Sequence, residues 1–238
     1  MLTYIIYQLW KLFFMTPTET PIIDWHSIDT ILLDMDGTLL DLHFDDHFWQ
    51  EYLPSRYAET NHLPLKRAKE ILEPKFKEME GTLEWYCLDF WSKELQMNIP
   101  ELKAEVSHLI AIHDGVVHFL DEARKLNKRI LLVTNAHPDV LRIKMEKTAL
   151  ADKFDQLVTS HEFGLPKENP EFWHKLVDKH YFDPESTIFI DDSLPVLLSA
   201  QSFGIKHLYT IRKPSSHKPA RNITEFPMIN SFFYLLPK

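Results

Sequence analysis

The chain is poor in cysteine and glycine, and each shortage excludes a class of protein. Cys87 is the only cysteine among 238 residues, so an intramolecular disulfide is impossible and a reducing cytoplasm is the expected compartment. Five glycines are too few for a collagen-like or low-complexity disordered chain. With 45% hydrophobic and 26% charged residues, the composition is typical of one globular domain, or of a core domain with a smaller insert.

Basic residues are fewer than acidic residues. The chain has 26 Lys and Arg against 35 Asp and Glu, which gives a net charge of -9. A protein that holds the backbone of a nucleic acid polymer by general electrostatics needs the opposite balance. The acidic balance is compatible with a small phosphorylated substrate, because a metal and a few local cations decide how such a ligand binds. We therefore expect a small-molecule partner and no nucleic acid polymer, while the oligomeric state stays open.

A long apolar run is missing as well, although the first 14 residues come close to one. They are apolar and aromatic, but Gln8 and Lys11 interrupt them, and they fall short of the roughly 20 residues that a membrane-spanning helix needs. A signal peptide is disfavoured because the segment lacks a basic start and a clear cleavage site. We interpret residues 1–22 as an N-terminal extension and predict no membrane span. The extension could be sequence upstream of a true start at Met15, an interfacial anchor helix, or a helix packed on the body.

From Thr30 onward, short apolar runs alternate with helical periodicity, the pattern of an α/β fold with a parallel sheet. The runs are compact and rich in β-branched residues, as strands buried on both faces should be. The predicted strands are Thr30–Leu33, Arg129–Val133, Gln156–Thr159, Thr187–Ile190 and His207–Thr210. The predicted helices among them are Val116–Leu126, Asp139–Thr148, Pro170–Lys179 and Pro195–Phe203.

One stretch between the first two predicted strands breaks this rhythm. It contains no convincing strand, only helical segments at Asp46–Tyr57, Leu65–Glu80, Leu83–Gln96 and Glu101–Ile110. We expect Pro74 to kink or end the second of these helices. The sequence therefore predicts a helical insert at residues 43–112 and a core made of residues 23–42 and 113–238.

Polar side chains stand at or just beyond the ends of four predicted strands. In parallel α/β sheets, the carboxyl ends of the strands meet at one edge, where ligands bind. The groups expected at this edge are Asp34 and Asp36 after the first strand, Thr134 and Asn135 after the second, Lys167 in the loop beyond the third, and Asp191 and Asp192 after the fourth. Clustered carboxylates raise one another's pKa unless a cation joins them. Such an oxygen-rich cluster suits Mg²⁺, a hard cation that prefers carboxylates and water.

Phosphate-ester chemistry needs this combination of groups. The phosphate dianion repels an attacking carboxylate, so we expect Mg²⁺ and Lys167 to neutralise it before Asp34 attacks the phosphorus. Asp36 can protonate the leaving oxygen and later activate water. Thr134 would add a hydrogen bond to the phosphate, and Gly37 would let the loop turn tightly. These residues predict a Mg²⁺-dependent phosphatase with Asp34 as its nucleophile.

Four segments stand in a fixed order along the chain: Asp34-Met-Asp-Gly-Thr38, the strand ending at Thr134-Asn135, Gly164-Leu-Pro-Lys-Glu-Asn-Pro-Glu-Phe172 and Ile188-Phe-Ile-Asp-Asp-Ser193. Together they resemble the motifs of the haloacid dehalogenase (HAD)-like hydrolases, over nearly all of residues 28–212. The resemblance implies a Rossmann-like parallel sheet flanked by helices, with the insert as a small all-helical cap. It also implies an aspartyl-phosphate intermediate on Asp34, and Mg²⁺ held by the Asp34 carboxylate, the Asp36 backbone carbonyl and Asp192. Asp191 stands where relatives often have Gly or Glu, which implies a water-mediated or indirect contact with the ion.

Three further segments carry a second resemblance: Leu39-Leu-Asp-Leu-His-Phe-Asp-Asp-His-Phe-Trp49, Leu83-Glu-Trp-Tyr-Cys-Leu-Asp-Phe-Trp91 and Thr134-Asn-Ala-His-Pro138. Through these segments the chain is also similar to bacterial 5′-nucleotidases that act on GMP and IMP. This resemblance implies a purine nucleoside monophosphate as the substrate. A purine base could stack on Trp49, Trp85 or Tyr86, with Asp45, Asp46 or Asp89 accepting from its N–H groups. The remaining residues expected to bind the substrate are Thr134, Asn135 and Lys167.

Other interpretations of the same residues stay open. The insert aromatics, Trp85 and Tyr86 among them, could be helix core, and the pair Asp191-Asp192 could cap a helix. The 13 histidines are dispersed without a convincing ligand spacing, His137 could be a loop residue or touch the substrate, and Cys87 is interpreted as a small hydrophobe.

Other functions also fit this fold. The chain could be a phosphatase or phosphomutase for a small sugar phosphate, or a non-catalytic binding module. A dehalogenase is disfavoured, since carbon–halogen cleavage needs neither Asp36 nor Mg²⁺. A binding module is disfavoured because binding alone does not require an acid/base group.

Overall fold

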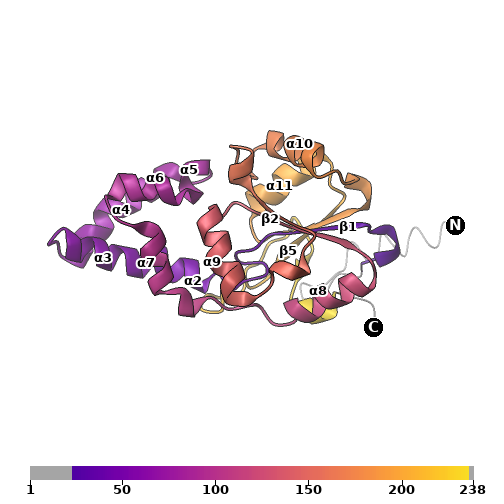
Figure 1. The fold of residues 1–238 in the computed structure, drawn as a ribbon, viewed down its shortest axis with the longest axis horizontal. Helices are drawn as coiled ribbons and strands as arrows, with labels where there is room; N and C mark the ends of the chain where they lie inside the picture. Colours follow the sequence, from indigo (N-terminus) through magenta and orange to yellow (C-terminus); the bar gives the residue numbers. More distant parts are fainter. Residues whose placement is uncertain (1–22, 236–238) are drawn as a thin grey trace.

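A six-stranded parallel sheet forms the centre of the computed structural model, which describes residues 23–235 (Figure 1). The strand order is β3-β2-β1-β4-β5-β6, and every neighbouring pair is parallel. The strands are β1 (Thr30–Leu33), β2 (Arg129–Thr134), β3 (Gln156–Thr159), β4 (Thr187–Ile190), β5 (His207–Ile211) and β6 (Met228–Ile229). This confirms the predicted α/β fold with a parallel sheet. The short strand β6 was not predicted, because two apolar residues show no periodicity.

The interpretation of residues 1–22 as an extension concerns a segment outside the described residues. Within residues 23–235, no helix is both long enough and apolar enough to cross a membrane.

Helices cover both faces of the sheet, because successive side chains of a buried strand point to opposite faces. In β1, Ile31 and Leu33 pack in the apolar cluster with α8 and α9, whereas Leu32 packs in the cluster with α10 and α11. The four helices are α8 (Val116–Lys125), α9 (Pro138–Thr148), α10 (Pro170–Lys179) and α11 (Leu194–Phe203). Each lies within one residue of the predicted bounds at either end.

The chain between β1 and α8 forms the helical body on the left of Figure 1. Its elements are α2 (His43–His47), the π-helical turn η2 (Phe48–Tyr52), α3 (Leu53–Thr60), α4 (Leu65–Met79), α5 (Leu83–Tyr86), α6 (Leu88–Leu95), α7 (Ile99–Glu105) and the 3-10 turn η3 (Ser107–Leu109). Its buried side chains Phe44, Phe48 and Trp91 belong to the same apolar cluster as the α8 and α9 face of the sheet. The insert therefore packs on the core through a continuous apolar interior.

One expectation for the insert was wrong in detail, and of the two effects expected of Pro74 one is excluded. The predicted helix Leu83–Gln96 is broken at Cys87, whose backbone is extended and whose Sγ accepts from the Phe90 N–H at 3.5 Å as the N-cap of α6. Pro74 does not end its helix, because α4 continues to Met79. Phe76 and Met79 pack against the same apolar cluster as Leu72, so packing beyond the proline compensates for the missing hydrogen bond.

The two chain segments that join insert and core run side by side. The backbone N–H of Asp41 donates to Ala111 O, and that of His113 donates to Leu39 O, both at 2.9 Å. Leu40 and Ile112 form an isolated antiparallel bridge between these bonds. Both connections therefore leave the core close to the end of β1, where Asp34 lies.

Candidate active site

The loop after β1 carries two carboxylates to the carboxyl edge of the sheet. Asp34 lies between the ends of β2 and β4, and its backbone N–H donates to Ile190 O at 3.0 Å. Gly37 has a φ of 81°, and a Cβ at this position would lie 2.7 Å from Cγ of Asp192. Glycine is therefore required both for the left-handed backbone and for the close approach. The loop passes directly against a carboxylate that comes from the fourth strand.

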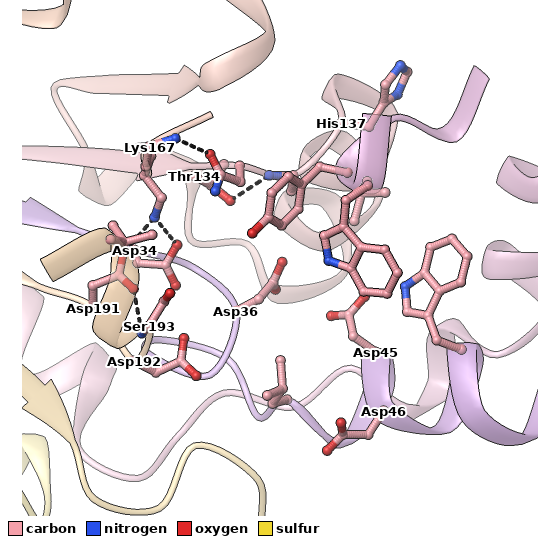
Figure 2. A pocket seen from close by; sticks show the side chains of 18 of the residues that line it. Asp34, Asp36, Asp45, Asp46, Thr134, His137, Lys167, Asp191, Asp192 and Ser193 are labelled. Atoms are coloured by element: carbon pink, nitrogen blue, oxygen red, sulfur yellow. Dashed lines mark hydrogen bonds and ion pairs between the residues drawn. The ribbon is translucent and has the colours of Figure 1, made fainter. Parts of the chain in front are cut away.

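Lys167 joins the first and fourth strand ends. Its Nζ donates to Oδ1 of Asp34 and Oδ2 of Asp191, each at 2.6 Å (Figure 2). It also donates to Val133 O at 3.1 Å. The lysine is 2% exposed. Burial lowers the pKa of this ammonium, but the charges of Asp191 and Asp34 outweigh burial and raise the pKa above its usual value. Lys167 is thus a permanent positive charge beside the predicted nucleophile.

The end of β2 holds the loop that carries Lys167. Asn135 accepts at Oδ1 from the Lys167 backbone N–H at 2.9 Å and donates from Nδ2 to Oε2 of Glu168 at 2.9 Å. Thr134 accepts at Oγ1 from the Ala136 N–H at 3.0 Å, which leaves its hydroxyl hydrogen free to donate to a ligand. Thr134 and Asn135 both line the cavity above the sheet edge.

Asp191 and Asp192 follow β4 but have different partners. Asp191 uses both carboxylate oxygens within the protein, because Oδ2 accepts from Lys167 and Oδ1 accepts from the Ser193 N–H at 2.8 Å. Asp192 pairs through Oδ2 with Arg221, whose Nη2 lies 3.2 Å away and whose Nη1 donates to the Asp192 carbonyl oxygen at 2.7 Å. Asp192 therefore has more capacity left for a ligand than Asp191.

A second buried lysine, Lys144 of α9, connects the core with the insert. Its Nζ donates to Oδ1 of Asp36 at 2.5 Å and to Oδ2 of Asp45 at 2.6 Å. Lys103 of α7 donates to the other oxygen of Asp45 at 2.6 Å. Burial raises the pKa of Asp45, but these two ammonium groups outweigh it and hold the pKa at about 2. Asp45 lines the cavity as expected, yet both of its oxygens already accept from lysines.

A cavity of about 370 Å³ lies above these groups, within the usual range for small-ligand sites. Trp49 and Trp85 of the insert line it with their rings nearly parallel, 6.0 Å between centroids. Trp91 is fully buried behind them, as the core-packing interpretation expects. Tyr86 also lines the cavity and donates from its hydroxyl to Oε1 of Glu168 at 2.7 Å. The cavity thus has a polar floor made by the core and an aromatic wall made by the insert.

Most of the predicted binding residues meet around this cavity, and one does not. Asp46 and His137 line it along with the strand-end groups, and Figure 2 shows His137 away from the strand-end carboxylates. The side chain of Asp89 is 81% exposed and is not part of the lining. Asp89 lies 3.7 Å from Nε2 of His137 instead.

Burial raises the pKa of the strand-end carboxyl groups. The pKa is about 6 for Asp34, Asp36 and Asp191, and about 7 for Asp192. Loss of hydration is the largest cause for each group, and repulsion between neighbouring carboxylates adds to it, as that of Asp34 does for Asp192. Lys167 and Lys144 lower these pKa values without restoring the usual range. The folded chain therefore concentrates negative charge that it does not fully neutralise.

The same cluster has the composition of a cation site. Asp34, Asp191 and Asp192 each place one carboxylate oxygen within 4.8 Å of the others, and all three are buried. Among residues 23–235, Lys167 and Arg221 are the cations in direct contact with this cluster, so negative charge is in excess when all three ionise. A cluster made only of oxygen donors suits a hard divalent cation. The buried aspartates could therefore bind a metal ion.

Four residues that build the site were not identified from the sequence. They are Lys103, Lys144, Glu168 and Arg221. Lys144 shares its helix face with Val140, Leu141 and Met145, all buried, and a lysine on an apolar face is the signal that could have revealed it. Arg221 lies outside regular secondary structure, where no periodicity predicts its neighbours.

Comparison with known proteins adds to this geometry. A family model for "Hydrolase: haloacid dehalogenase-like hydrolase" matches residues 28–204. The chain is 36% identical over 215 residues to the GMP/IMP nucleotidase YrfG of Escherichia coli, an alignment that covers 90% of this chain and 97% of that protein. It is 24% identical over 188 residues to the pyrophosphatase PpaX of Bacillus velezensis, which covers 75% of this chain and 81% of that protein.

A solved structure has the same fold. The crystal structure of a HAD phosphatase from Thermococcus onnurineus matches with a TM-score of 0.71 at 19% identity, covering 87% of this chain and 95% of that chain. At this level of identity, the match supports the arrangement of sheet, flanking helices and insert.

Proposed function

The chain belongs to the haloacid dehalogenase-like hydrolase family, and we propose that it is a phosphomonoesterase that hydrolyses purine nucleoside 5′-monophosphates such as GMP and IMP. One observation carries the proposal: Asp34 and its 2.6 Å partner Lys167 lie on the floor of a cavity whose opposite wall contains Trp49 and Trp85. The polar floor suits a phosphate, and the aromatic wall suits a base. The 36% identity to a GMP/IMP nucleotidase supports this substrate class.

In the first step, the Asp34 carboxylate attacks the phosphorus and the bond to the 5′ oxygen breaks. Asp36 gives its proton to the leaving oxygen, so the nucleoside departs as a neutral alcohol and the phosphoryl group stays on Asp34. Lys167 provides positive charge beside the attacking carboxylate, and the free hydroxyl hydrogen of Thr134 can bond a phosphate oxygen.

In the second step, Asp36 takes a proton from water, and the resulting hydroxide attacks the phosphorus of the aspartyl phosphate. The bond between phosphorus and the Asp34 oxygen breaks, which releases inorganic phosphate and restores the carboxylate. A group that first donates and then accepts a proton works best with a pKa near the working pH. The pKa of about 6 at Asp36 suits both halves of the cycle.

The metal that we propose for this site is Mg²⁺, held by the carboxylates of Asp34 and Asp192 and the backbone carbonyl of Asp36. When bound, it would neutralise phosphate charge and offset the repulsion within the cluster. Asp191 would act indirectly, because both of its oxygens are occupied by Lys167 and the Ser193 N–H. The excess of negative charge among the buried aspartates supports this assignment.

We further propose that residues 43–112 act as a cap over a core of residues 23–42 and 113–238. Tyr86 of the insert donates to Glu168, the residue next to Lys167, and Asp45 accepts from Lys144 of the core. These contacts would hold the aromatic wall over the strand ends while a substrate is bound. The base would lie against Trp49, Trp85 or Tyr86.

The experiment that tests the activity is phosphate release from a panel of nucleotides and sugar phosphates, with Mg²⁺ and with EDTA. The proposal requires a higher kcat/KM for GMP and IMP than for any sugar phosphate, and loss of turnover in EDTA. A preference for sugar phosphates would refute the proposed nucleotide substrate but would still support phosphomonoester hydrolysis. Absence of phosphate release from every compound would favour a non-catalytic module and refute the proposal.

A second experiment tests the aromatic wall. Trp49→Leu and Trp85→Leu should raise KM for GMP by roughly 5- to 10-fold, the loss of about 1 kcal/mol of stacking, and leave KM for p-nitrophenyl phosphate nearly unchanged. The small ester serves as the internal control, because it uses the floor of the site without a purine. Equal increases for both substrates would show that the tryptophans act only by packing.

A further inference from the structure

A second group of metal-binding side chains gathers where the insert meets the core. Cys87 stands between α5 and α6 of the insert, His137 follows β2 of the core, and His161 lies in the short 3-10 turn after β3. One ligand atom from each of the three residues lies within 4.8 Å of the other two. None of the three belongs to the strand-end carboxylate cluster. Their sequence positions are far apart, so only the fold brings them together.

His161 has a ring nitrogen without a partner. Its Nε2 is buried and makes no hydrogen bond within the described residues, while the ring makes a hydrogen bond with the backbone of Asn135. Imidazoles that bind metals commonly donate one ring N–H to a backbone carbonyl, which leaves the other nitrogen to face the ion. A buried nitrogen with no partner otherwise costs free energy. The orientation of His161 therefore suits a ligand better than a packed core residue.

His137 faces His161 and has a carboxylate near each ring nitrogen. The two rings lie 5.1 Å apart between centroids. Asp139 Oδ2 is 3.7 Å from Nδ1 of His137, and Asp89 Oδ2 is 3.7 Å from Nε2. In this structure Nδ1 of His137 accepts from the Asp139 N–H at 3.3 Å, so binding of an ion at Nε2 requires the ring hydrogen to move to Nδ1, where the Asp139 carboxylate can accept it. The exposed Asp89 or a water can complete a four-coordinate shell.

The donor types select the class of metal. Cys87 supplies a thiol whose Sγ already accepts from the Phe90 N–H at the start of α6, a position that favours negative charge. One sulfur and two imidazole nitrogens suit borderline-soft cations of the Zn²⁺ type, whereas Mg²⁺ prefers oxygen. The two clusters in this protein are therefore chemically distinct.

We propose that Cys87, His137 and His161 form a binding site for a Zn²⁺-type divalent cation, and that the bound ion ties the insert to the core. The ion would bridge the same boundary as the hydrogen bond from Tyr86 to Glu168. Since His137 also lines the substrate cavity, an occupied site would restrict opening of the cavity. Zn²⁺ would thus act as a regulator that does not compete with the ion at the aspartates.

Cobalt(II) titration of the full chain, with excess Mg²⁺ and with the thiol kept reduced, tests the site. We expect one equivalent of Co²⁺ to bind with the absorption of a four-coordinate complex and a thiolate-to-metal charge-transfer band, and Zn²⁺ to displace it. Cys87 is the only cysteine of the chain, so this band reports on that residue alone. Absence of the band in the unaltered protein overturns the proposal, whatever the variants do.

Variants then assign the ligands. Cys87→Ser should abolish the charge-transfer band, and His137→Ala and His161→Ala should each weaken Co²⁺ binding by about 100-fold or more, since losing even an outer-shell partner costs 10- to 100-fold. Asp192→Asn and the distant His174→Ala are the matched controls and should retain the band at full intensity. Unchanged binding in His161→Ala, or loss of the band in Asp192→Asn, would overturn the assignment. Circular dichroism of each variant checks that it folds.

Hydrogen exchange tests whether the bound ion holds the insert against the core. One equivalent of Zn²⁺ should slow amide exchange in α5 and α6, which carry Cys87 at their junction, and should not slow it in His161→Ala. Exchange rates that do not respond to Zn²⁺ in the unaltered protein would show that an ion bound there does not hold the insert.

Discussion

Two buried lysines, Lys167 and Lys144, occupy similar positions in the site and differ in what they join. Each ammonium bonds two carboxylates at 2.5 to 2.6 Å. Lys167 bonds Asp34 and Asp191, which both lie at strand ends of the core. Lys144 bonds Asp36 of the core and Asp45 of the insert. The position of Asp34 is therefore set within the core, whereas that of Asp36 is coupled to the insert.

The balance of charge differs as well. The Lys167 cluster includes Asp192 and has three carboxylates against the two cations Lys167 and Arg221. Burial raises its pKa values to about 6 or 7, and repulsion between the carboxylates adds to this effect. The Lys144 cluster pairs two carboxylates with two ammonium groups, because Lys103 also bonds Asp45. The first cluster is suited to receive a cation. The second is already compensated and is suited to position the acid/base group.

The largest expected contrast is between Asp34→Asn and Asp45→Asn. Asp34→Asn should lower kcat by about 10⁴-fold or more, as loss of a nucleophile does in other enzymes, because an amide cannot attack phosphorus. Asp45→Asn should lower kcat by only about 10-fold, since it loosens Lys144 without removing a reacting group. Steady-state phosphate release measures both, and circular dichroism shows whether each variant is folded. Similar losses of kcat in the two variants would contradict the difference in role between the Lys167 cluster and the Lys144 cluster.

Replacing each lysine should lower the free energy of unfolding by a different amount in the Lys167 cluster than in the Lys144 cluster. Lys167→Met leaves Asp34 and Asp191 buried without their cation, so in EDTA it should lower the free energy of unfolding by about 3–5 kcal/mol. Lys144→Met should cost about 1–3 kcal/mol, because Asp45 retains Lys103 and Asp36 is partly exposed. Urea unfolding at pH 8 gives both values. An equal cost would mean that Lys103 does not compensate for Lys144.

The charge excess predicts how stability depends on pH in the absence of metal. Asp192 has a pKa of about 7 in the folded chain against an ordinary 3.8, so the folded state holds this proton more tightly than the unfolded state. Its contribution is complete below about pH 4 and is lost as pH rises through 7. Asp34 and Asp191 act in the same direction up to about pH 6.

Thermal unfolding in EDTA from pH 5 to 8 measures this effect. Asp192→Asn should show a smaller loss of Tm over this range than the unaltered protein, and Mg²⁺ should raise Tm of the unaltered protein most at pH 8. The comparison with the variant is needed because the partly buried histidines His113 and His161, whose pKa values are lowered, act in the opposite direction. A steeper loss in Asp192→Asn would contradict the assignment of excess charge to this cluster.

The smallest expected effect concerns a contact between the insert and the core that involves neither lysine. Tyr86→Phe removes the hydroxyl that donates to Glu168 and keeps the ring. We expect KM for GMP to rise by roughly 2- to 10-fold, the equivalent of one hydrogen bond, with kcat nearly constant. Asn135→Ala is the contrasting variant, because it also loosens the Lys167 loop and should lower kcat. A kcat loss in Tyr86→Phe would indicate that the tyrosine positions reacting groups.

The sequence by itself determined the sheet and the floor of the site. Compact β-branched runs predict strands locally, and the group that follows such a strand must lie at its carboxyl end. For this reason Asp34, Thr134 and Asp192 could be placed next to one another before any contact was known. The helices of the core could also be predicted from local periodicity, and their predicted ends lie within one residue of the observed ends.

Only the tertiary structure decided which partners these groups have. Lys144 and Asp36 are 108 residues apart and Lys144 and Asp45 are 99 apart, so their contact depends on how α9 is rotated between the sheet and the insert. The break at Cys87, which separates α5 from α6 beside His137 and His161, likewise has no signal in a continuous helical pattern. Periodicity describes which face of one element is apolar. It does not describe which distant element will cover that face, because packing across the whole chain sets that choice.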